Sequence, residues 1–322
     1  MTHLVHAPVL DAQLVADLVP LAARAAELAD AARAPNTRRA YARAWRTFRG
    51  WAEARGRMAL PAAPETLALY LTDRATAVSV ATLEQEIAAI TDAHRAADVP
   101  SPTESRDVQL VWKGIRRTYG TPARGKAPVG VLDLARMVHE LGDTPSSVRD
   151  RAILLLGFAG GLRRSELVAV DVEDLVQNPD GYALRIRRSK TDAEGEGHLI
   201  GIPNGRRPET CPVQAVRAWL ALAGIQRGAV FRPVTRHGTI GTSRLRDRAV
   251  AEILKRAARA IGLDAREISG HSLRAGLATE AVRAGVSERA IMAQTRHKSI
   301  AAFRGYVRTG SLFLENPAAA LL

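Results

Sequence analysis

Four side chains near the end of the chain have types and spacing that could act on a phosphate. The stretch 268–308 contains His271 and Arg274 three residues apart, then His297, and then Tyr306 nine residues later. An arginine can hold phosphate oxygens by charge-assisted hydrogen bonds, and a histidine can accept a proton. A tyrosine hydroxyl beside such groups is a candidate nucleophile, so this stretch predicts attack on a phosphate.

Each of these residues also has an ordinary structural explanation. The chain contains 8 histidines and 41 arginines, so one His-x-x-Arg spacing is expected by chance. An isolated tyrosine usually buries its ring and hydrogen-bonds its hydroxyl within the fold. The functional interpretation therefore depends on further residues that belong to the same chemistry.

The local pattern predicts how these side chains are positioned. If Ser269 or Ser272 caps a helix, the first histidine and its arginine share one face of the first turn, where the helix N-terminus also favours an anion. A second helix is expected over 286–294. After a break, a short helix capped by Ser299 would carry Tyr306.

Earlier parts of the chain supply further polar side chains. Arg163 and Glu166 lie three residues apart at a predicted helix start, hence on one helix face, and a short strand should follow. The alternating pattern over 182–202 predicts a β-hairpin with Lys190 near its tip. The chain has 5 lysines against 41 arginines, so a lysine here hints that an ammonium of adjustable pKa is needed.

Length and composition indicate a globular protein, and 322 residues favour two domains. The longest apolar run, 152–162, is too short to span a membrane and contains three glycines. The N-terminus lacks the pattern of a signal peptide, so we expect a cytoplasmic protein. The single Cys211 rules out an intramolecular disulfide and is expected to be buried. Neither metal-ligand spacing nor a glycine-rich nucleotide motif occurs, so we expect no metal and no cofactor.

The net charge of +13 is unevenly distributed. Residues 1–120 contain 15 basic and 13 acidic side chains, whereas residues 121–322 contain 31 and 20. The candidate chemical residues thus lie in the more basic part of the chain. A basic domain of this size indicates a polyanionic partner, and nucleic acid is the first candidate. The alternative is a solvated basic surface.

The first part of the chain has the pattern of helices. Residues 1–34 are expected to be an N-terminal extension with one helix, and 35–118 a small helical bundle that begins with an aromatic stripe between arginines. Within the bundle, Ser79 should cap one helix and another should start at Thr103. Residues 119–130 are rich in glycine, proline and basic side chains, which is typical of a linker. The basic faces could also be ordinary solvated surface. The side chains expected to contact nucleic acid are Arg38, Arg39, Arg43, Arg46, Arg116, Arg117, Arg124 and Lys126.

The candidate chemical residues follow one another in an order that resembles the tyrosine recombinase, or phage integrase, family. In sequence order they are Arg163, Lys190, His271, Arg274, His297 and Tyr306. The family has an arginine, a hairpin lysine, His-x-x-Arg, a second histidine or tryptophan, and a nucleophilic tyrosine. The resemblance covers a catalytic domain at 131–308, and 35–118 resembles the family's core-binding domain. It implies a mainly α fold with a small β-sheet or hairpin in the C-terminal domain.

The resemblance implies a site-specific recombinase that cleaves and rejoins double-stranded DNA through a 3′-phosphotyrosyl bond, without metal or ATP. Arg163 and Arg274 would hold the nonbridging oxygens on which charge develops. A phenol with a pKa near ~10 needs a base, for which His271 is the candidate. Lys190 would protonate the departing 5′ oxygen, and the second histidine would donate a hydrogen bond to the phosphate. Glu166 would orient Arg163 or His271.

The family further implies a homo-oligomer, a tetramer on two DNA sites. The tail, 309–322, could be an apolar helix that docks into a neighbouring protomer or onto its own domain. Two other functions remain open: relaxation of DNA by a type IB topoisomerase, and sequence-specific binding by a protein whose catalytic set is vestigial.

Two departures from the family pattern concern arginines. Arg296 precedes His297 at a position where the family often has glycine. Arg164 adjoins Arg163, and the first of the two is preferred because it follows Gly-Leu and lies three residues before Glu166.

Overall fold

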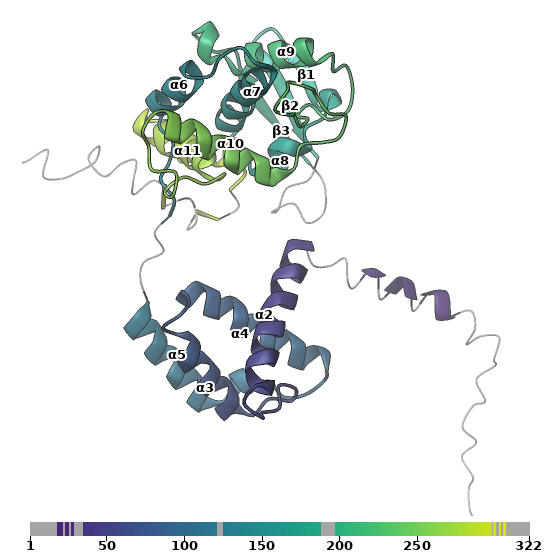
Figure 1. The fold of residues 1–322 in the computed structure, drawn as a ribbon, viewed down its shortest axis with the longest axis vertical. Helices are drawn as coiled ribbons and strands as arrows, with labels where there is room; N and C mark the ends of the chain where they lie inside the picture. Colours follow the sequence, from purple (N-terminus) through teal and green to yellow (C-terminus); the bar gives the residue numbers. More distant parts are fainter. Residues whose placement is uncertain are drawn as a thin grey trace, which may run out of the picture. The chain divides into compact units, whose positions relative to one another are not determined.

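The chain folds into two compact units, residues 1–124 and 125–322 (Figure 1). The computed structural model describes residues 18–21, 23–25, 27, 28, 35–120, 125–187, 197–297, 299, 300, 303, 305 and 306. Of the predicted N-terminal helix, the residues described between 18 and 28 are helical. The rest of that prediction lies outside the described part, as does the tail 309–322.

Helices make up the described part of the first unit. They are α2 (Pro35–Glu53), α3 (Pro64–Arg74), α4 (Val80–Ala96), the short 3-10 turn η1 (Pro102–Glu104) and α5 (Arg106–Tyr119). Local sequence explains their starts: Pro64 occupies the first turn of α3, and the Ser79 side chain accepts the backbone N–H of Thr82 at the start of α4.

The core of the first unit depends on residues spaced four apart in α2. Ala44, Phe48 and Ala52 are buried because this spacing places them on one face of the helix. Trp45 and Trp51 of the aromatic stripe pack partly against the same cluster. The opposite face of α2 is left to exposed arginines.

The second unit combines helices with one small sheet. Its elements are α6 (Val131–His139), α7 (Pro145–Ala159), α8 (Arg164–Ala169), η2 (Val172–Asp174), β1 (Leu175–Asn178), β2 (Gly181–Ile186), β3 (His198–Pro203), η3 (Pro208–Thr210), α9 (Pro212–Ala223), α10 (Asp247–Ala260), α11 (Ser272–Arg283) and α12 (Glu288–Thr295).

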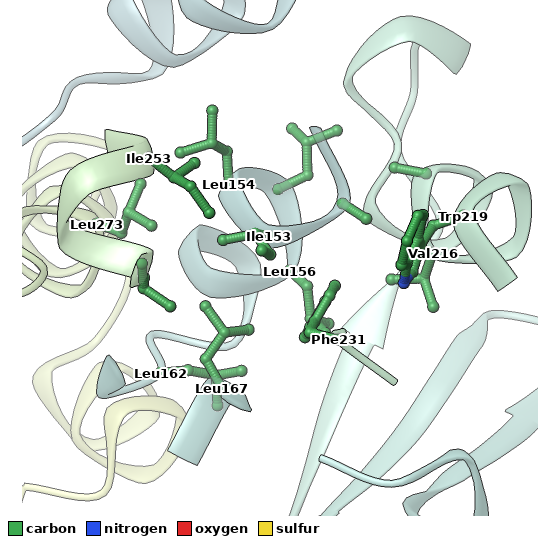
Figure 2. Packing of buried hydrophobic residues seen from close by; sticks show 14 of the residues in the cluster. Ile153, Leu154, Leu156, Leu162, Leu167, Val216, Trp219, Phe231, Ile253 and Leu273 are labelled. Atoms are coloured by element: carbon green, nitrogen blue, oxygen red, sulfur yellow. The ribbon is translucent and has the colours of Figure 1, made fainter. Parts of the chain in front are cut away.

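Helix α7 is the centre of the second unit. It is buried over most of its circumference, which explains the apolar run in the sequence. Figure 2 shows Ile153 and Leu156 of α7 between Trp219 of α9 and Leu273 of α11. Cys211 is buried at the start of α9, as predicted, and is 1% exposed.

The predicted hairpin is part of a three-stranded antiparallel sheet in the order β1-β2-β3. Tyr182 pairs with Ile202 and Ile186 with His198, so alternate residues of β2 face the core. The predicted short strand begins only at Leu175, after η2. A mainly helical fold with a small sheet is thereby confirmed. No helix within the described residues has the length and apolar character needed to cross a membrane.

Candidate active site

The hydroxyl of Tyr306 forms a hydrogen bond with Nε2 of His271. His271 is the N-cap residue of α11. The prediction that Ser269 or Ser272 caps this helix is wrong, because their hydroxyls stabilise the preceding turn instead. Ser269 Oγ accepts the N–H of His271 at 3.2 Å, and Ser272 Oγ accepts the N–H of Ser269 at 3.0 Å. This turn holds the imidazole at the helix start, facing Tyr306.

The second histidine, His297, also lies against the ring of Tyr306. The ring centroids of His297 and Tyr306 are 5.5 Å apart, and those of His297 and Phe303 are 5.9 Å apart. Nδ1 of His297 is 2.7 Å from the hydroxyl of Thr295, the fully buried last residue of α12. Phe303 is buried with Ile291 in a small apolar cluster that Tyr306 partly joins. Apolar packing and two hydrogen bonds, His297 with Thr295 and Tyr306 with His271, therefore fix the positions of both rings.

Arg163 immediately precedes α8 and is bound to Glu166. The Glu166 carboxylate accepts the backbone N–H of Arg163 at 2.9 Å and its Nη1 at 2.5 Å. Glu166 is buried and also accepts Nη2 of Arg296 at 2.8 Å. Burial by itself would raise the pKa of the Glu166 carboxyl, but the charge of Arg296 and the hydrogen bonds from Arg163 outweigh it, so the pKa lies below its usual value.

Arg274 is fully buried, yet most of its hydrogen-bonding capacity is unused. Its Nη1 donates to the carbonyl of Gly161 at 2.8 Å, whereas its Nε and Nη2 have no partner in the described part of the chain. Burial, together with the charges of Arg163 and Arg296, lowers the pKa of Arg274 to about 10. A buried cation with free donors is expensive to maintain, and an anion would complete its bonding.

The environment sets the protonation of the two histidines and the tyrosine. Partial burial and the positive charges of Arg274 and Arg163 lower the pKa of His271. The same causes, in the same order, lower the pKa of His297 to about 4. Burial raises the pKa of Tyr306, and the two arginines offset part of that rise. At neutral pH the site therefore contains a neutral imidazole bonded to a protonated phenol.

The structure brings five of the six predicted catalytic residues together, with Glu166 beside them. These five are Arg163, His271, Arg274, His297 and Tyr306. The sixth, Lys190, lies outside the described residues, although β2 and β3, which precede and follow it in the sequence, are described. Glu166 contacts Arg163 rather than His271. Arg164 has an exposed side chain 4.0 Å from Asp247.

The basic residues predicted to contact nucleic acid lie on the surface. Arg38, Arg39, Arg43 and Arg46 are exposed on α2, Arg116 and Arg117 are exposed on α5, and Arg124 lies outside the described residues. Lys126 is exposed but donates to the carbonyl of Arg266 at 2.6 Å. The residues of the predicted linker that follow Lys126 pack on the second unit, and Val129 among them is fully buried.

Two residues of the site were not assigned a role from the sequence. Arg296 drew attention only because glycine is usual at its position, and Thr295 drew none. Arg296 acts through long-range contacts with Glu166 and Gly161 that a sequence pattern does not reveal, whereas Thr295 acts through local hydrogen bonds with Ile291 and His297. Among the described residues, no group of three or more His, Cys, Asp or Glu side chains could hold a metal ion.

Comparison with known proteins agrees with this geometry. The model of the phage integrase family matches residues 132–311. An integrase/recombinase XerD homologue of Selenomonas ruminantium is 38% identical over 301 residues, which cover 92% of this chain and 88% of the relative.

Two solved structures have a similar fold. The XerH recombinase bound to its palindromic difH substrate, in a post-cleavage complex, superposes with a TM-score of 0.58 at 15% identity, over 80% of this chain and 71% of that one. A lambda integrase tetramer bound to a Holliday junction gives a TM-score of 0.55 at 16% identity, over 77% and 65% of the two chains. Family match, relative and fold agree, and the chain belongs to the phage integrase family of tyrosine recombinases.

Proposed function

We propose that this chain is a site-specific recombinase that cleaves and rejoins double-stranded DNA through Tyr306. The observation that carries the proposal is the hydrogen bond between the Tyr306 hydroxyl and Nε2 of His271, close to the buried charge of Arg274. A phenol with a raised pKa needs a base, and a neutral imidazole in contact with it can accept the proton.

In the first step the phenolic oxygen of Tyr306 attacks phosphorus, and the bond from phosphorus to the 5′ oxygen breaks. The phenolic proton passes to His271. Lys190 would give a proton to the departing 5′ oxygen. The products are a 3′-phosphotyrosyl bond and a free 5′ hydroxyl.

Arg163 and Arg274 would stabilise the charge that develops on the nonbridging oxygens. The unpaired Nε and Nη2 of Arg274 supply two donors that need no rearrangement to accept a phosphate. His297 would add a hydrogen bond to the same phosphate. Glu166 would orient Arg163 without reacting, since it holds both the backbone and the side chain of that arginine.

In the second step a 5′ hydroxyl of another strand attacks the phosphotyrosine, and the tyrosine regains its proton. One phosphoester bond forms for each one that breaks, so the exchange needs no ATP. The arginine and histidine side chains would supply the charge stabilisation that a metal gives in other phosphoryl transfers. The relatives are named as recombinases and integrases, which disfavours the topoisomerase and the vestigial DNA-binding protein.

We extend the proposal to the domains and the assembly. Residues 35–118 would be the core-binding domain, 119–130 the linker and 131–308 the catalytic domain. The exposed arginines of α2 and α5 would neutralise DNA phosphates. A tetramer on two DNA sites is supported by the lambda integrase neighbour, and the tail 309–322 is the candidate for its intersubunit contact. The DNA substrate would place the protein in the cytoplasm.

The test is a covalent-complex assay with DNA from the element or chromosome that encodes the chain, with EDTA present. Wild type should form an SDS-resistant complex at the 3′ end of a nick, and Tyr306→Phe should form none. Tyr119→Phe is the matched control, because Tyr119 is exposed and lies in the first unit. A complex that persists in Tyr306→Phe would refute the nucleophile, and its absence in wild type across a genomic library would refute cleavage.

A further inference from the structure

Helix α12 ends in a left-handed bend at a residue that is not glycine. Arg296 has φ 56° and ψ 46°, and the bend turns the chain so that His297 follows directly. Side chains with a Cβ disfavour this conformation, and glycine is the usual residue where a helix ends this way. Asp98 is the other described residue with a Cβ and a positive φ, at 52°, and it is exposed. The arginine at 296 therefore opposes the backbone preference of its position.

The side chain of Arg296 turns inward rather than toward solvent. The residue is 5% exposed, and its guanidinium donates four hydrogen bonds. Nη2 donates to Glu166 at 2.8 Å and to the carbonyl of Gly161 at 3.2 Å. Nη1 donates to the carbonyls of Gln294 at 2.7 Å and Gly160 at 3.3 Å. An arginine retained for solubility would not be buried in this way.

Two of these acceptors also hold the arginines assigned to the phosphate. Glu166 binds Arg163, and the carbonyl of Gly161 accepts Nη1 of Arg274 at 2.8 Å. Arg296 thus shares the Glu166 carboxylate with Arg163 and the Gly161 carbonyl with Arg274. A guanidinium can do this because its planar fork presents several donors in fixed directions, whereas an ammonium cannot.

Arg296 also changes the charge that the site presents. Glu166 would neutralise Arg163 and leave Arg274 as one net positive charge. With Arg296 bound to the far oxygen of the same carboxylate, the four groups carry a net charge of two, in surroundings largely shielded from water. Charge developing on the phosphate oxygens would be stabilised more strongly there than by one net cation.

We propose that Arg296 is a positioning residue for DNA cleavage: it holds Glu166 and the Gly161 carbonyl so that Arg163 and Arg274 present their donors to the phosphate. This inference rests on the proposed function. It assigns Arg296 no contact with the DNA. The cost of the left-handed bend is offset by what the buried guanidinium contributes to the site.

The decisive variant is Arg296→Gly, because glycine fits the left-handed bend and the buried guanidinium is lost with the rest of the side chain. Cleavage should be measured as the rate of covalent complex formation on a nicked site that traps the intermediate, alongside DNA affinity and the thermal midpoint. The rate should fall by about 100-fold, as expected for small displacements of catalytic groups. The DNA affinity should stay near that of wild type, whereas the thermal midpoint should fall by a few degrees, because a buried side chain and one buried ion pair are removed. Arg296→Lys should be intermediate, since it restores a charge without the fork.

Asp98→Gly is the matched control, because it relieves the same backbone conformation at an exposed residue without removing a buried ion pair. It should cleave at the wild-type rate. The pH profile adds a readout that a purely structural role would not move. The charge of Arg296 is among those that lower the pKa of His297, so its loss should raise that pKa. Because the protonated imidazole is the form that can donate to the phosphate, the basic side of the profile should move to higher pH.

A wild-type cleavage rate in Arg296→Gly would overturn the proposal, as would a slowing that is matched by lost stability and lost DNA binding. If Arg296→Gly does not fold, Arg296→Lys decides in the same way. Tyr306→Phe is included in every series. If wild type forms no complex that depends on Tyr306, the proposed recombinase function fails. If it does form one and the Arg296 variants equal it, only the positioning role fails.

Discussion

Each unit of the protein buries a glutamate against arginine, and the two clusters are built differently. In the first unit Glu86 accepts the hydroxyl of Tyr70 at 2.8 Å and Nη2 of Arg74 at 2.5 Å. In the second unit Glu166 binds Arg163 and Arg296. A third arginine, Arg274, donates to the Gly161 carbonyl that Arg296 also contacts. Both carboxylates are almost fully buried, at 4% exposed each. Burial of a charge therefore does not distinguish them.

The difference lies in whether the donors are used. The cluster around Glu86 pairs one carboxylate with one guanidinium and one hydroxyl, and it raises the pKa of Tyr70 by burial and by the hydrogen bond to Glu86. In the cluster around Glu166, Arg274 keeps two buried N–H groups without a partner among the described residues. A structural cluster satisfies its own members, whereas a site that awaits an anion leaves donors unsatisfied. Substitutions in the two clusters should therefore have opposite effects on cleavage and on stability.

The largest effect is expected from Arg274→Met. Removing the guanidinium should slow covalent complex formation by about 1000-fold, the upper range for loss of a charge-stabilising donor. The free energy of unfolding should be unchanged or higher, because a desolvated cation near Arg163 and Arg296 is removed. Single-turnover cleavage and urea unfolding of the same preparation measure both. A large loss of stability would show that this arginine supports the fold, and the contrast would fail.

The next effect is expected from Arg74→Met, with the opposite pattern. This change leaves Glu86 buried without its cation, which should lower the free energy of unfolding by about 3 kcal/mol. The cleavage rate of the folded fraction should be close to that of wild type, since Arg74 belongs to the first unit. Urea unfolding measures the loss, and Arg283→Ala, at an exposed pair with Glu280, is the control that should change little. Equal stability of Arg74→Met and wild type would contradict a closed structural cluster.

The smallest effect concerns pH. The pKa of His297 falls from 6.5 to about 4 on folding, so the unfolded chain takes up a proton first as the pH drops. The free energy of unfolding should therefore decrease from about pH 6.5 downward, with the loss complete below about pH 4. The free energy of unfolding of His297→Gln should decrease less over this pH range. Folding also lowers the pKa of His271. Wild type and His297→Gln both contain His271, so its contribution cancels in the comparison. Unfolding curves at pH 7.5 and 5.0 give the difference, and parallel losses would argue against the lowered pKa.

Much of the fold could be predicted because it is locally encoded. The cap at Ser79 and the spacing of Phe48 with its neighbours are sequence-local, and the helices there agree with prediction. Boundaries were wrong where competing hydrogen bonds decide. The helix predicted to start at Thr103 begins at Arg106, because the turn η1 comes first. The serines near His271 stabilise a turn instead of capping the helix.

The candidate site was predictable in its residue types because the chemistry demands them in a recognisable order. The arrangement behind those residues was not. The contact between Arg296 and Glu166 joins residues 130 positions apart, and an arginine among 41 gives no local signal of burial. The one hint was that Arg296 stands at a position where the family often has glycine. The structure explains this conflict by the left-handed bend.

The hydrogen bond between Thr295 and His297 determines which nitrogen of the imidazole carries its proton. The Thr295 hydroxyl donates to the carbonyl of Ile291 at 2.6 Å, so its oxygen accepts from Nδ1 of His297. The neutral ring then has a lone pair on Nε2. His297 can donate to a phosphate oxygen only after gaining a second proton, which its low pKa forbids until the anion arrives. Recognition of DNA would thus consume a proton from solvent, and the heat of binding would depend on the buffer that supplies it.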